Sequence, residues 1–393
     1  MHRRTRYVAL TCILVLTLVA LYRKYSPIVV DGDPDYFPLT GEIPDSATST
    51  QAALEDPIEP TIEPAVDIPP HRIVFDAEGR ANATFIMLAR NSDLKGALLS
   101  LRQLEDRFNR RFNYPHVFLN EEEFTDDFKR QIRNLTPSQV EFGVIPSEHW
   151  YQPEWIDDEK AQEAMKQMAR MNVKYGGNLA YHNMCRFNSG FFFKHPLVQK
   201  YQWYWRVEPN VKFHCDISQD PFRFMVENNK TYGFTLAVYE IPATIRSLWG
   251  HVKDFMAKYP EYIRDEDNAL KFISNDRGGT YSRCHFWSNF EIASLDFWRS
   301  EAYSTFFDYL DATGGFYYER WGDAPVHSIA AALMLSKSQI HLFEDIGYQH
   351  DDWSHCPQTQ ELWEAGRCMC SRHDSFDYSS DSCRRKWDAL GVD

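Results

Sequence analysis

The sequence is short of basic residues and lacks the common nucleotide-binding motifs. Its 393 residues include 42 Lys and Arg against 56 Asp and Glu, a net charge of −14 at pH 7. Such an acidic chain offers no basic field to neutralise a phosphodiester backbone, so no nucleic-acid partner is expected. No internal repeat, GxGxxG motif or P-loop occurs, which argues against the common dinucleotide enzymes and NTPases. The HExxH motif of many zinc hydrolases is also missing.

Basic residues are entirely absent from one stretch near the N-terminus. Residues 25–71 contain no Lys or Arg, while nine prolines and ten acidic residues occur there. Such a composition buries too little apolar surface to fold, and its prolines keep the chain extended. We therefore predict a disordered Pro-rich, acidic stem over residues 23–71. A segment that binds a partner protein is the alternative for this stretch.

Long apolar runs are also scarce, with a single one at residues 7–22. Basic residues flank it, namely Arg3, Arg4 and Arg6 before the run and Arg23 and Lys24 after it. The run is slightly shorter than the roughly 17 to 25 residues of a typical spanning helix, so a cleaved signal peptide is the alternative. Because no clear cleavage site follows, we predict a transmembrane signal-anchor with residues 1–6 as a cytosolic tail. The excess of arginine before the run predicts a single-pass type II protein with a luminal domain, and the short span suits the Golgi.

The cysteines and the glycosylation sequons agree with a luminal domain. Eight cysteines occur, and Cys12 lies in the predicted anchor, so an odd number remains and at least one is free or pairs between chains. Cys368 and Cys370 favour disulfides, with a zinc site as the alternative. Asn-x-Thr sequons stand at three positions, Asn82, Asn134 and Asn229.

After Arg72 the pattern changes to short apolar runs that alternate with amphipathic segments. We expect strands at 83–88, 116–119 and 140–145, and helices at 91–108 and 121–133. This alternation predicts βαβ units and a mainly parallel sheet with helices on both faces. Residues 72–393 would form the luminal catalytic domain, with ligands at the carboxyl ends of the strands.

An oxygen-rich triplet follows one aromatic run. Trp203–Val207 leads directly into Glu208-Pro209-Asn210, so a carboxylate and an amide stand where a buried strand ends. Oxygen ligands suit Mn²⁺ or Mg²⁺, which can also hold a diphosphate, and the nearby Arg206 can pair with a phosphate or a carboxylate. An ordinary strand-ending turn is the alternative for this triplet.

Several long motifs closely resemble one known family. They include YGGNLAYHNMCRFNSGFFFKHP and YQWYWRVEPNVKFHCDI, within residues 174–249. The likeness continues through CHFWSNFEIASLDFWRS, GGFYYERWGDAPVHSIAAAL and FEDIGYQH, and covers roughly residues 72–357. These segments resemble the fungal Golgi α-1,2-mannosyltransferases of glycosyltransferase family 15, the glycolipid 2-alpha-mannosyltransferases.

This resemblance implies a GT-A-like nucleotide-sugar-binding fold, a GDP-mannose donor, a mannose-terminated acceptor glycan and Mn²⁺. It also implies transfer with retention to give an α-1,2 linkage. On this chain the family's metal ligands fall on Glu208 and His350, its proposed nucleophile on Glu291, and a tyrosine of the donor and acceptor site on Tyr181. Many members have Glu-Pro-Asp where this chain has Asn210, which keeps a carbonyl oxygen for the site but loses a charge.

Further residues are candidates on chemical grounds. Asp323 could serve as a base or bind the acceptor hydroxyl. Glu319, Arg320 and His327 are as consistent with a buried polar network as with catalysis. The glycine at 347 allows a turn or a close backbone approach just before His350, which favours a ligand role for this histidine over a structural one.

Retention allows two chemical routes, a glycosyl-enzyme intermediate on a carboxylate or a same-face reaction assisted by the leaving phosphate. Two alternatives to a mannosyltransferase are also considered. One is a catalytically weak relative that binds mannan or acts as a scaffold, suggested by Asn210 alone. The other is a metal-dependent luminal hydrolase, for which no ligand spacing is present.

Overall fold

The computed structural model describes residues 75–392. The predicted cytosolic tail, signal-anchor and stem at residues 1–71 lie outside the described residues. Within residues 75–392, no helix combines the length and the apolar character that crossing a membrane requires.

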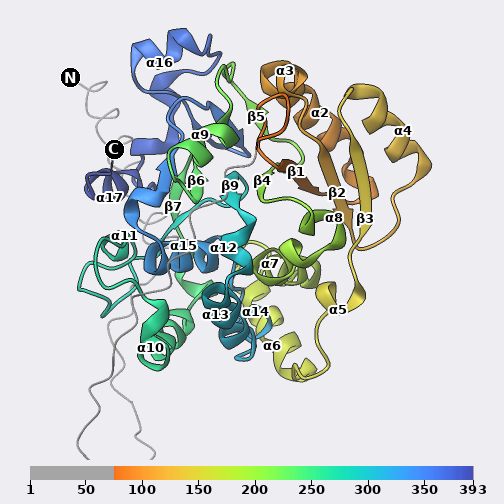
Figure 1. The fold of residues 1–393 in the computed structure, drawn as a ribbon. Coiled ribbons are helices and arrows are strands. Elements are labelled where there is room, and N and C mark those ends of the chain that lie inside the picture. Colours follow the sequence, from red (N-terminus) through yellow and green to blue (C-terminus); the bar gives the residue numbers. More distant parts are fainter. Residues whose placement is uncertain (1–74, 393) are drawn as a thin grey trace, which may run out of the picture. The chain divides into compact units, whose positions relative to one another are not determined.

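A seven-stranded sheet forms the centre of the described domain (Figure 1). Its strand order is β10-β6-β9-β4-β1-β2-β3. The strands are β1 (Ala83–Leu88), β2 (His116–Asn120), β3 (Val140–Val144), β4 (Trp203–Arg206), β6 (Tyr232–Phe234), β9 (Glu291–Ser294) and β10 (Ile340–Leu342). Four of the six pairings are parallel, and the two pairings of β9 are antiparallel. The prediction of a mainly parallel sheet is therefore confirmed.

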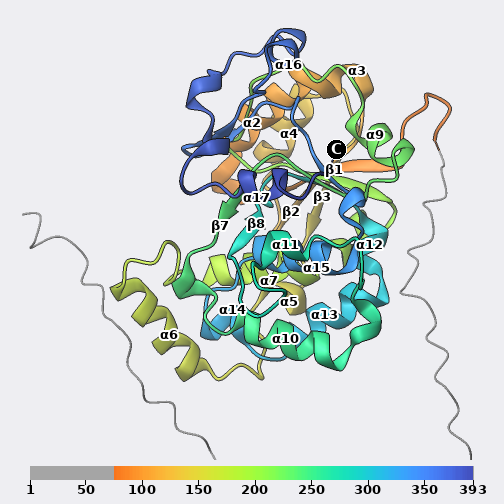
Figure 2. The same ribbon diagram turned by 90° about the vertical axis from the view of Figure 1, so that its left-hand side faces the viewer.

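Side chains alternate between two buried faces of the sheet, as the period of two in a strand requires. Phe85 and Trp205 belong to one core, while Ile86 and Tyr204, their neighbours in β1 and β4, belong to the other. The first core is covered by α2 (Leu94–Leu104), α4 (Asp126–Leu135) and α9 (Pro221–Glu227). The second is covered mainly by α7 (Leu179–Gly190), α10 (Leu248–Lys258), α12 (Leu295–Arg299), α13 (Glu301–Asp311), α14 (Gly315–Tyr318) and α15 (Asp323–Met334). Figure 2 shows α2 and α4 above the sheet and α7, α13 and α15 below it.

The antiparallel strand β9 brings its first residue to the edge where its neighbour β4 ends. Glu291 pairs with Arg206, the last residue of β4. Parallel strands expose ligand-binding groups at their carboxyl ends, whereas an antiparallel neighbour adds the groups at its own start. Residues on either side of the β4–β9 ladder therefore meet at one edge of the sheet.

The predicted elements match the structure closely in type and less closely in extent. The strand at 83–88 has the expected bounds. The segment at 91–108 is interrupted, with a 3₁₀ turn at Asn91–Asp93, α2, and a π-helix at Glu105–Asn109. The helix expected from residue 121 begins only at Asp126, because Thr125 caps it by accepting a hydrogen bond from the Phe128 amide.

Smaller elements complete the domain. The hairpin of β11 (Tyr348–His350) and β12 (Trp353–His355) pairs with β5 (Lys212–Phe213), and β7 (Ala237–Tyr239) pairs with β8 (Cys284–Phe286). Helix α6 (Asp158–Arg170) precedes α7. Six further helices are short, namely α3 (Arg110–Phe112), α5 (Ser147–Trp150), α8 (Pro196–Gln199), α11 (Leu270–Ile273), α16 (Gln360–Ala365) and α17 (Arg384–Asp388).

Three disulfides hold the C-terminal part of the chain to earlier strands. They join Cys215 to Cys368, Cys284 to Cys383 and Cys356 to Cys370. Cys185 is free and buried, so the expected odd cysteine is this one. The sulfurs of Cys215, Cys368 and Cys370 lie within 4.8 Å of one another, yet each belongs to a disulfide. The disulfide prediction for Cys368 and Cys370 is confirmed, and the zinc alternative is excluded because no thiolate is left to bind.

Candidate functional site

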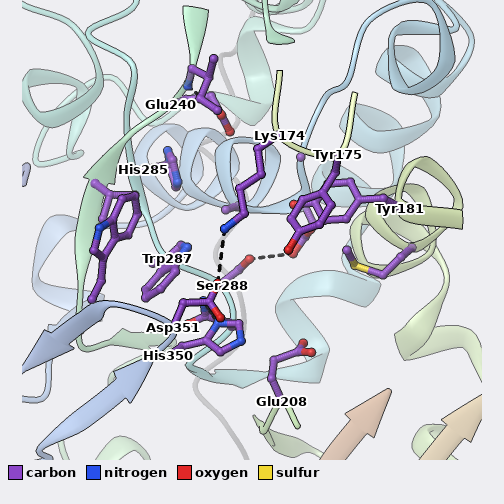
Figure 3. Close-up of a pocket in the computed structure, with 18 of the residues that line it drawn as sticks. Lys174, Tyr175, Tyr181, Glu208, Glu240, His285, Trp287, Ser288, His350 and Asp351 are labelled. Carbon is purple, nitrogen blue, oxygen red and sulfur yellow. Dashed lines mark hydrogen bonds and ion pairs between the residues drawn. The ribbon is translucent and has the colours of Figure 1, made fainter. Parts of the chain in front are cut away.

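A cavity of about 280 Å³ opens where β4 ends, next to the β11–β12 hairpin and the start of α15 (Figure 3). We call it the large cavity, in contrast to a small cavity of about 10 Å³ that Glu291 lines. Five of the predicted site residues line it, namely Tyr181, Arg206, Glu208, Asp323 and His350. These residues come from α7, from the end of β4, from α15 and from β11. The structure therefore brings together side chains that lie up to 169 positions apart in the sequence.

A second cavity, of about 310 Å³, adjoins the first at the carboxyl end of β1. Leu88, Arg90 and Asp93 line it together with Glu121, which follows β2. Five residues line both cavities, namely Tyr175, Tyr181, Met184, Glu208 and His350. A ligand that occupied both cavities would therefore pass Glu208 and His350.

Arg206 organises the carboxylates of the first cavity. Its Nε donates to Glu208 Oε1 at 2.7 Å, and its NH1 nitrogen donates to Asp323 Oδ2 at 2.5 Å. Burial alone would lower the pKa of the Arg206 guanidinium, but Asp323 and Glu208 raise that pKa well above its ordinary value. Arg206 is thus a fixed positive charge that holds two carboxylates in place.

Asp323 is the first residue of α15 and is 5% exposed. Its Oδ2 also accepts a hydrogen bond from Ser288 Oγ at 2.6 Å. Burial would raise the pKa of this carboxyl, but Arg206, His327 and Ser288 outweigh burial and lower it. Asp323 is therefore ionised at neutral pH and can accept a hydrogen bond from a substrate hydroxyl, but its lowered pKa makes it a weak base.

Glu208 and His350 each offer one unused ligand atom to the two cavities. Within residues 75–392, neither Glu208 Oε2 nor His350 Nε2 has a hydrogen-bond partner, while Glu208 Oε1 and His350 Nδ1 are engaged. A carboxylate oxygen and an imidazole nitrogen on shared cavity walls fit Mn²⁺, whose remaining ligands would be substrate oxygens and water. The residues present therefore suit the metal that the sequence predicted.

The close backbone approach expected at Gly347 is confirmed. A Cβ at this position would lie 2.5 Å from Cys215 Sγ, and the Gly347 carbonyl accepts a hydrogen bond from the His214 amide at 2.8 Å. Only glycine fits there without moving the hairpin. This contact fixes β11, and hence His350, against the segment that follows β5.

Asn289 contacts one ring nitrogen of His350. Its Nδ2 atom lies 2.9 Å from His350 Nδ1, and the hydroxyl of Tyr348 donates to the backbone carbonyl and the Oδ1 atom of Asn289. A histidine that binds a metal through Nε2 must carry its proton on Nδ1 and donate it to an oxygen. A half-turn of the Asn289 side-chain amide would exchange its nitrogen and oxygen and present Oδ1 to that proton, while the Tyr348 hydroxyl would keep its hydrogen bond to the Asn289 backbone carbonyl.

Replacing Asn289 with alanine should weaken Mn²⁺ binding by about 10- to 100-fold, because His350 would lose the partner that fixes its tautomer. The Asn289→Asp variant keeps an acceptor at this position and should bind Mn²⁺ at least as tightly as the unaltered protein. Titration calorimetry with Mn²⁺ in the presence of GDP measures both. Equal affinities for the alanine and aspartate variants would remove Asn289 from this role.

The structure does not bring Asn210 to either cavity. Its backbone has φ of +66°, and its amide nitrogen donates to the Gly96 carbonyl at 3.1 Å. The side chain lies against Gly96 of α2, where an added Cβ would meet Asn210 Nδ2 at 2.5 Å. Asparagine tolerates this left-handed conformation better than most residues, which gives a local reason for its presence. The structure thus places Asn210 as a turn residue that ends β4 against α2, and its role as a donor-binding residue stays a prediction.

Glu291 lies behind Arg206 rather than on the large cavity. It is 1% exposed and lines a separate small cavity of about 10 Å³ together with Arg206 and Asn188. Its carboxylate accepts hydrogen bonds from Tyr204 at 2.6 Å and Tyr232 at 3.0 Å, and His327 Nδ1 lies 3.0 Å from it. Glu291 is thus held rigidly by its neighbours, and it shares the small cavity with Arg206.

Tyr181 is part of a stack at the junction of the two cavities. Its ring lies on the ring of Tyr175, with centroids 4.4 Å apart and planes at 18°, and the Arg320 guanidinium lies 5.3 Å from its centroid. Asn178 caps the start of α7 by accepting from the Tyr181 amide. Burial raises the pKa of the Tyr181 hydroxyl well above its ordinary range, so this group stays protonated and can donate to a ligand.

The three residues predicted as a polar network belong to separate contacts. Glu319 accepts hydrogen bonds from the Ser247 amide and Trp321 Nε1, and His327 contacts Glu291. Arg320 donates to Glu240 at 3.2 Å and lines the large cavity. These side chains are hydrogen-bonded as in the polar-network alternative, but the three residues contact different neighbours and do not form a single network.

Sequence reasoning missed Glu240 and His285. Both line the large cavity, and Figure 3 shows Glu240 across the cavity from Glu208 and His350. A signal for Glu240 exists, since it follows strand β7 and precedes a proline closely, as Glu208 follows β4. His285 is buried within β8, and burial lowers the pKa of its imidazole, so it is neutral. Its sequence neighbours, Cys284 and Phe286, gave no sign that it faces a cavity.

Comparison with known protein families gives one match that spans most of the chain. A family model described as glycolipid 2-alpha-mannosyltransferase matches residues 45–390. The chain is 50% identical over 308 residues to glycolipid 2-alpha-mannosyltransferase 2 of Candida albicans, covering 78% of this chain and 67% of that protein. It is 53% identical over 308 residues to alpha-1,2 mannosyltransferase KTR1 of Saccharomyces cerevisiae, covering 78% of each chain.

Two solved structures are similar over most of the chain. Core-mannan synthase A from Aspergillus fumigatus, in a Mn/GDP form, is 38% identical with a TM-score of 0.76, covering 83% of this chain and 89% of that one. The mannosyltransferase Ktr4p from S. cerevisiae in complex with GDP is 41% identical with a TM-score of 0.76, covering 84% of this chain and 88% of that one.

Proposed function

This chain belongs to the glycolipid 2-alpha-mannosyltransferase family, and from that premise we propose that it transfers mannose from GDP-mannose to a mannose-terminated glycan, forming an α-1,2 linkage. The acceptor glycan is N-linked, O-linked or part of a glycolipid. One observation carries the proposal, namely that two cavities meet at Glu208 and His350. A nucleoside diphosphate sugar has the same arrangement, because its diphosphate lies between the nucleoside and the sugar.

The second cavity suits the nucleoside. It lies at the carboxyl ends of β1 and β2, the edge at which parallel sheets bind nucleotides. Solved relatives carry GDP, one of them with Mn. The large cavity, lined by Glu240, Asp323 and Tyr181, would then take the mannose and the acceptor, because carboxylates and a protonated phenol provide hydrogen bonds to sugar hydroxyls.

Glu208 and His350 would hold Mn²⁺ at the junction of the cavities. The metal supplies positive charge that neutralises the diphosphate as it leaves. Arg206 keeps Glu208 oriented through the bond to Oε1 and leaves Oε2 free. With its amide oxygen turned toward His350 Nδ1, Asn289 would leave Nε2 of that ring for the metal.

The residues of the large cavity would orient the acceptor. Within the described part of the chain, Asp323 Oδ1 has no hydrogen-bond partner, while Oδ2 is held by Arg206 and Ser288. This free oxygen suits the hydroxyl that attacks the mannose. Since the pKa of Asp323 is lowered, this carboxylate would position the hydroxyl and would not remove its proton early in the reaction.

The two chemical routes to retention assign different roles to the carboxylate of Glu291. A glycosyl-enzyme route needs Glu291 to reach the sugar from the small cavity beside Arg206. A same-face route uses only the leaving phosphate and the groups that line the large cavity. The two routes differ in what the Glu291→Gln variant does, as argued below.

Asn210 was the only reason to consider a catalytically weak relative that binds mannan or acts as a scaffold. The side chain of this residue lies against α2 rather than in a cavity. The substitution therefore leaves the two metal-ligand candidates untouched.

GDP with Mn²⁺ should raise the melting temperature of the purified protein by several degrees, because a ligand that binds only the folded state stabilises it by mass action. GDP alone should give a smaller shift, since the metal bridges protein and diphosphate. In the same preparation, release of GDP from GDP-mannose should require both Mn²⁺ and a mannoside acceptor. A protein whose melting temperature is unchanged by GDP and Mn²⁺ is not this transferase.

We further propose a single-pass type II Golgi membrane protein with the catalytic domain in the lumen. The three disulfides support an oxidising compartment. The sequon residues Asn82, Asn134 and Asn229 are all exposed, which leaves room for glycans.

Enzymatic removal of N-glycans should therefore reduce the apparent mass of the protein made in a fungal host. Asn82 is the weakest candidate, because its side-chain amide donates to the Lys200 carbonyl at 3.0 Å. The double variant Asn134→Gln, Asn229→Gln should remove most of the shift. A chain whose mass does not change on deglycosylation contradicts luminal exposure of these sites.

A further inference from the structure

Residues 171–178 connect α6 to α7 and pass over the junction of the two cavities. Tyr175 in this loop lines both cavities, and Lys174 lines the large one. Tyr175 has φ of +61°, a left-handed conformation that is costly for an aromatic residue. It is nevertheless 45% exposed, so burial does not explain the conformation. Strain of this kind, at a cavity mouth, points to a functional role for the loop.

Lys174 reaches across the cavity to the hairpin that carries His350. Its Nζ lies 3.3 Å from Asp351 Oδ2 and 5.3 Å from the centre of the Tyr175 ring (Figure 3). Asp351 directly follows His350 in the sequence. The side chains of Lys174 and Asp351 are 62% and 56% exposed. An ion pair this exposed contributes little to stability, so it can be exchanged for another partner at small cost.

The other cations on the cavity walls are less free to move. Arg206 and Arg320 are buried and held by carboxylates, the first by Glu208 and Asp323 and the second by Glu240. Arg90 is exposed, but it lines the second cavity, next to Asp93. Among the described residues of the large cavity, Lys174 is therefore the cation that can turn to an incoming anion.

We propose that Lys174 is a diphosphate-binding residue that exchanges Asp351 for an oxygen of the β-phosphate when the donor binds. This inference rests on the proposed function. In the transfer, the bond between the mannose anomeric carbon and the β-phosphate oxygen breaks, and its electron pair stays on that oxygen. The acceptor hydroxyl forms the new carbon–oxygen bond, and its proton passes to the departing diphosphate. The Lys174 ammonium stabilises the negative charge that grows on the phosphate and loses no proton itself.

Asp351 is the resting partner of Lys174. Without donor it neutralises the ammonium and holds it over the junction next to His350. With donor it competes with the phosphate for the same cation. Removing the lysine and removing the aspartate should therefore change diphosphate affinity in opposite directions. A purely structural ion pair would give losses of the same sign from both substitutions.

The test compares binding of GDP and GMP at saturating Mn²⁺ by titration calorimetry. Lys174→Met should weaken GDP binding about tenfold, the effect of losing one charge-assisted hydrogen bond, and change GMP binding by less than about twofold. Asp351→Asn should tighten GDP binding by about two- to fivefold. Lys166→Met, an exposed lysine of α6 that lines neither cavity, is the matched control and should match the unaltered protein.

Each other outcome overturns the inference. Equal GDP affinity for Lys174→Met and the unaltered protein removes Lys174 from the phosphate. Weaker GDP binding in Asp351→Asn shows that the pair supports the loop and does not compete with phosphate. An equal loss of GMP and GDP binding places Lys174 on the nucleoside instead. If the unaltered protein binds no GDP in Mn²⁺, the proposed function itself fails, which is a separate result.

Discussion

Replacing Glu208 with alanine should abolish metal-dependent mannose transfer while the protein remains folded. Glu208 stands just after β4 with its side chain 19% exposed, so its loss removes a ligand atom at a strand end and leaves the core intact. Without this carboxylate the cavity keeps a single protein ligand, His350, for the metal. We expect kcat/KM to fall by at least about 1,000-fold, which corresponds to about 4 kcal/mol of transition-state stabilisation.

Transfer from GDP-mannose to a mannoside at several Mn²⁺ concentrations measures this loss. Circular dichroism and the melting temperature monitor the fold. The control is Glu227→Ala, which removes a carboxylate from an exposed ion pair on α9 and should retain full activity. If Glu208→Ala transferred mannose at the normal rate, the metal would have to be bound elsewhere.

Replacing Glu291 with glutamine should slow transfer by about 100-fold or more and change GDP affinity by less than about twofold. Glutamine has nearly the same shape but no charge, and Glu291 lies beside the small cavity rather than at the junction that would hold the diphosphate. Its negative charge also contributes to the high pKa of Arg206, which orients Glu208 and Asp323. Single-turnover kinetics and GDP calorimetry on the same preparation separate the two effects.

The two retention routes give different further results for this variant. A glycosyl-enzyme route predicts a mannose-modified Glu291 peptide in the mass spectrum of the unaltered protein stopped during turnover, and no such peptide in the variant. A same-face route predicts no modified peptide in either protein. Full turnover in Glu291→Gln would assign the chemistry to the leaving phosphate and the groups of the large cavity.

The sequence predicts local structure well where one physical rule acts alone. The strand at 83–88 is a short apolar run between polar segments, and the structure gives the same bounds. The helix start at Asp126 was misplaced by five residues because apolar spacing extends beyond the point at which Thr125 supplies the cap. In the π-helical turn at Glu105–Asn109, Glu105 accepts a hydrogen bond from Thr136 and Asn109 donates one to Ser138, and no local pattern reveals these contacts.

The site was predictable as a set of residues but not as a geometry. Motif resemblance placed Glu208, His350 and Tyr181, residue chemistry added Asp323 and Arg206, and these five line one cavity. The place of the Asn210 side chain against α2 was not predictable, because a position in a triplet does not reveal a φ of +66°. Glu291 and Arg206 are paired only because β9 runs antiparallel to β4, a matter of topology rather than of local sequence.

The disulfides near the β11–β12 hairpin have a practical consequence for making this enzyme. Cys215 touches the backbone of Gly347, and both Cys215–Cys368 and Cys356–Cys370 tie the segments that flank His350 to the rest of the domain. We therefore expect His350, one of the two proposed metal ligands, to take its final position only after these thiols have been oxidised, which follows the synthesis of β4. Protein expressed in a reducing bacterial cytosol should accordingly bind nucleotide poorly until it is refolded under oxidising conditions. Secreted protein should bind nucleotide without refolding.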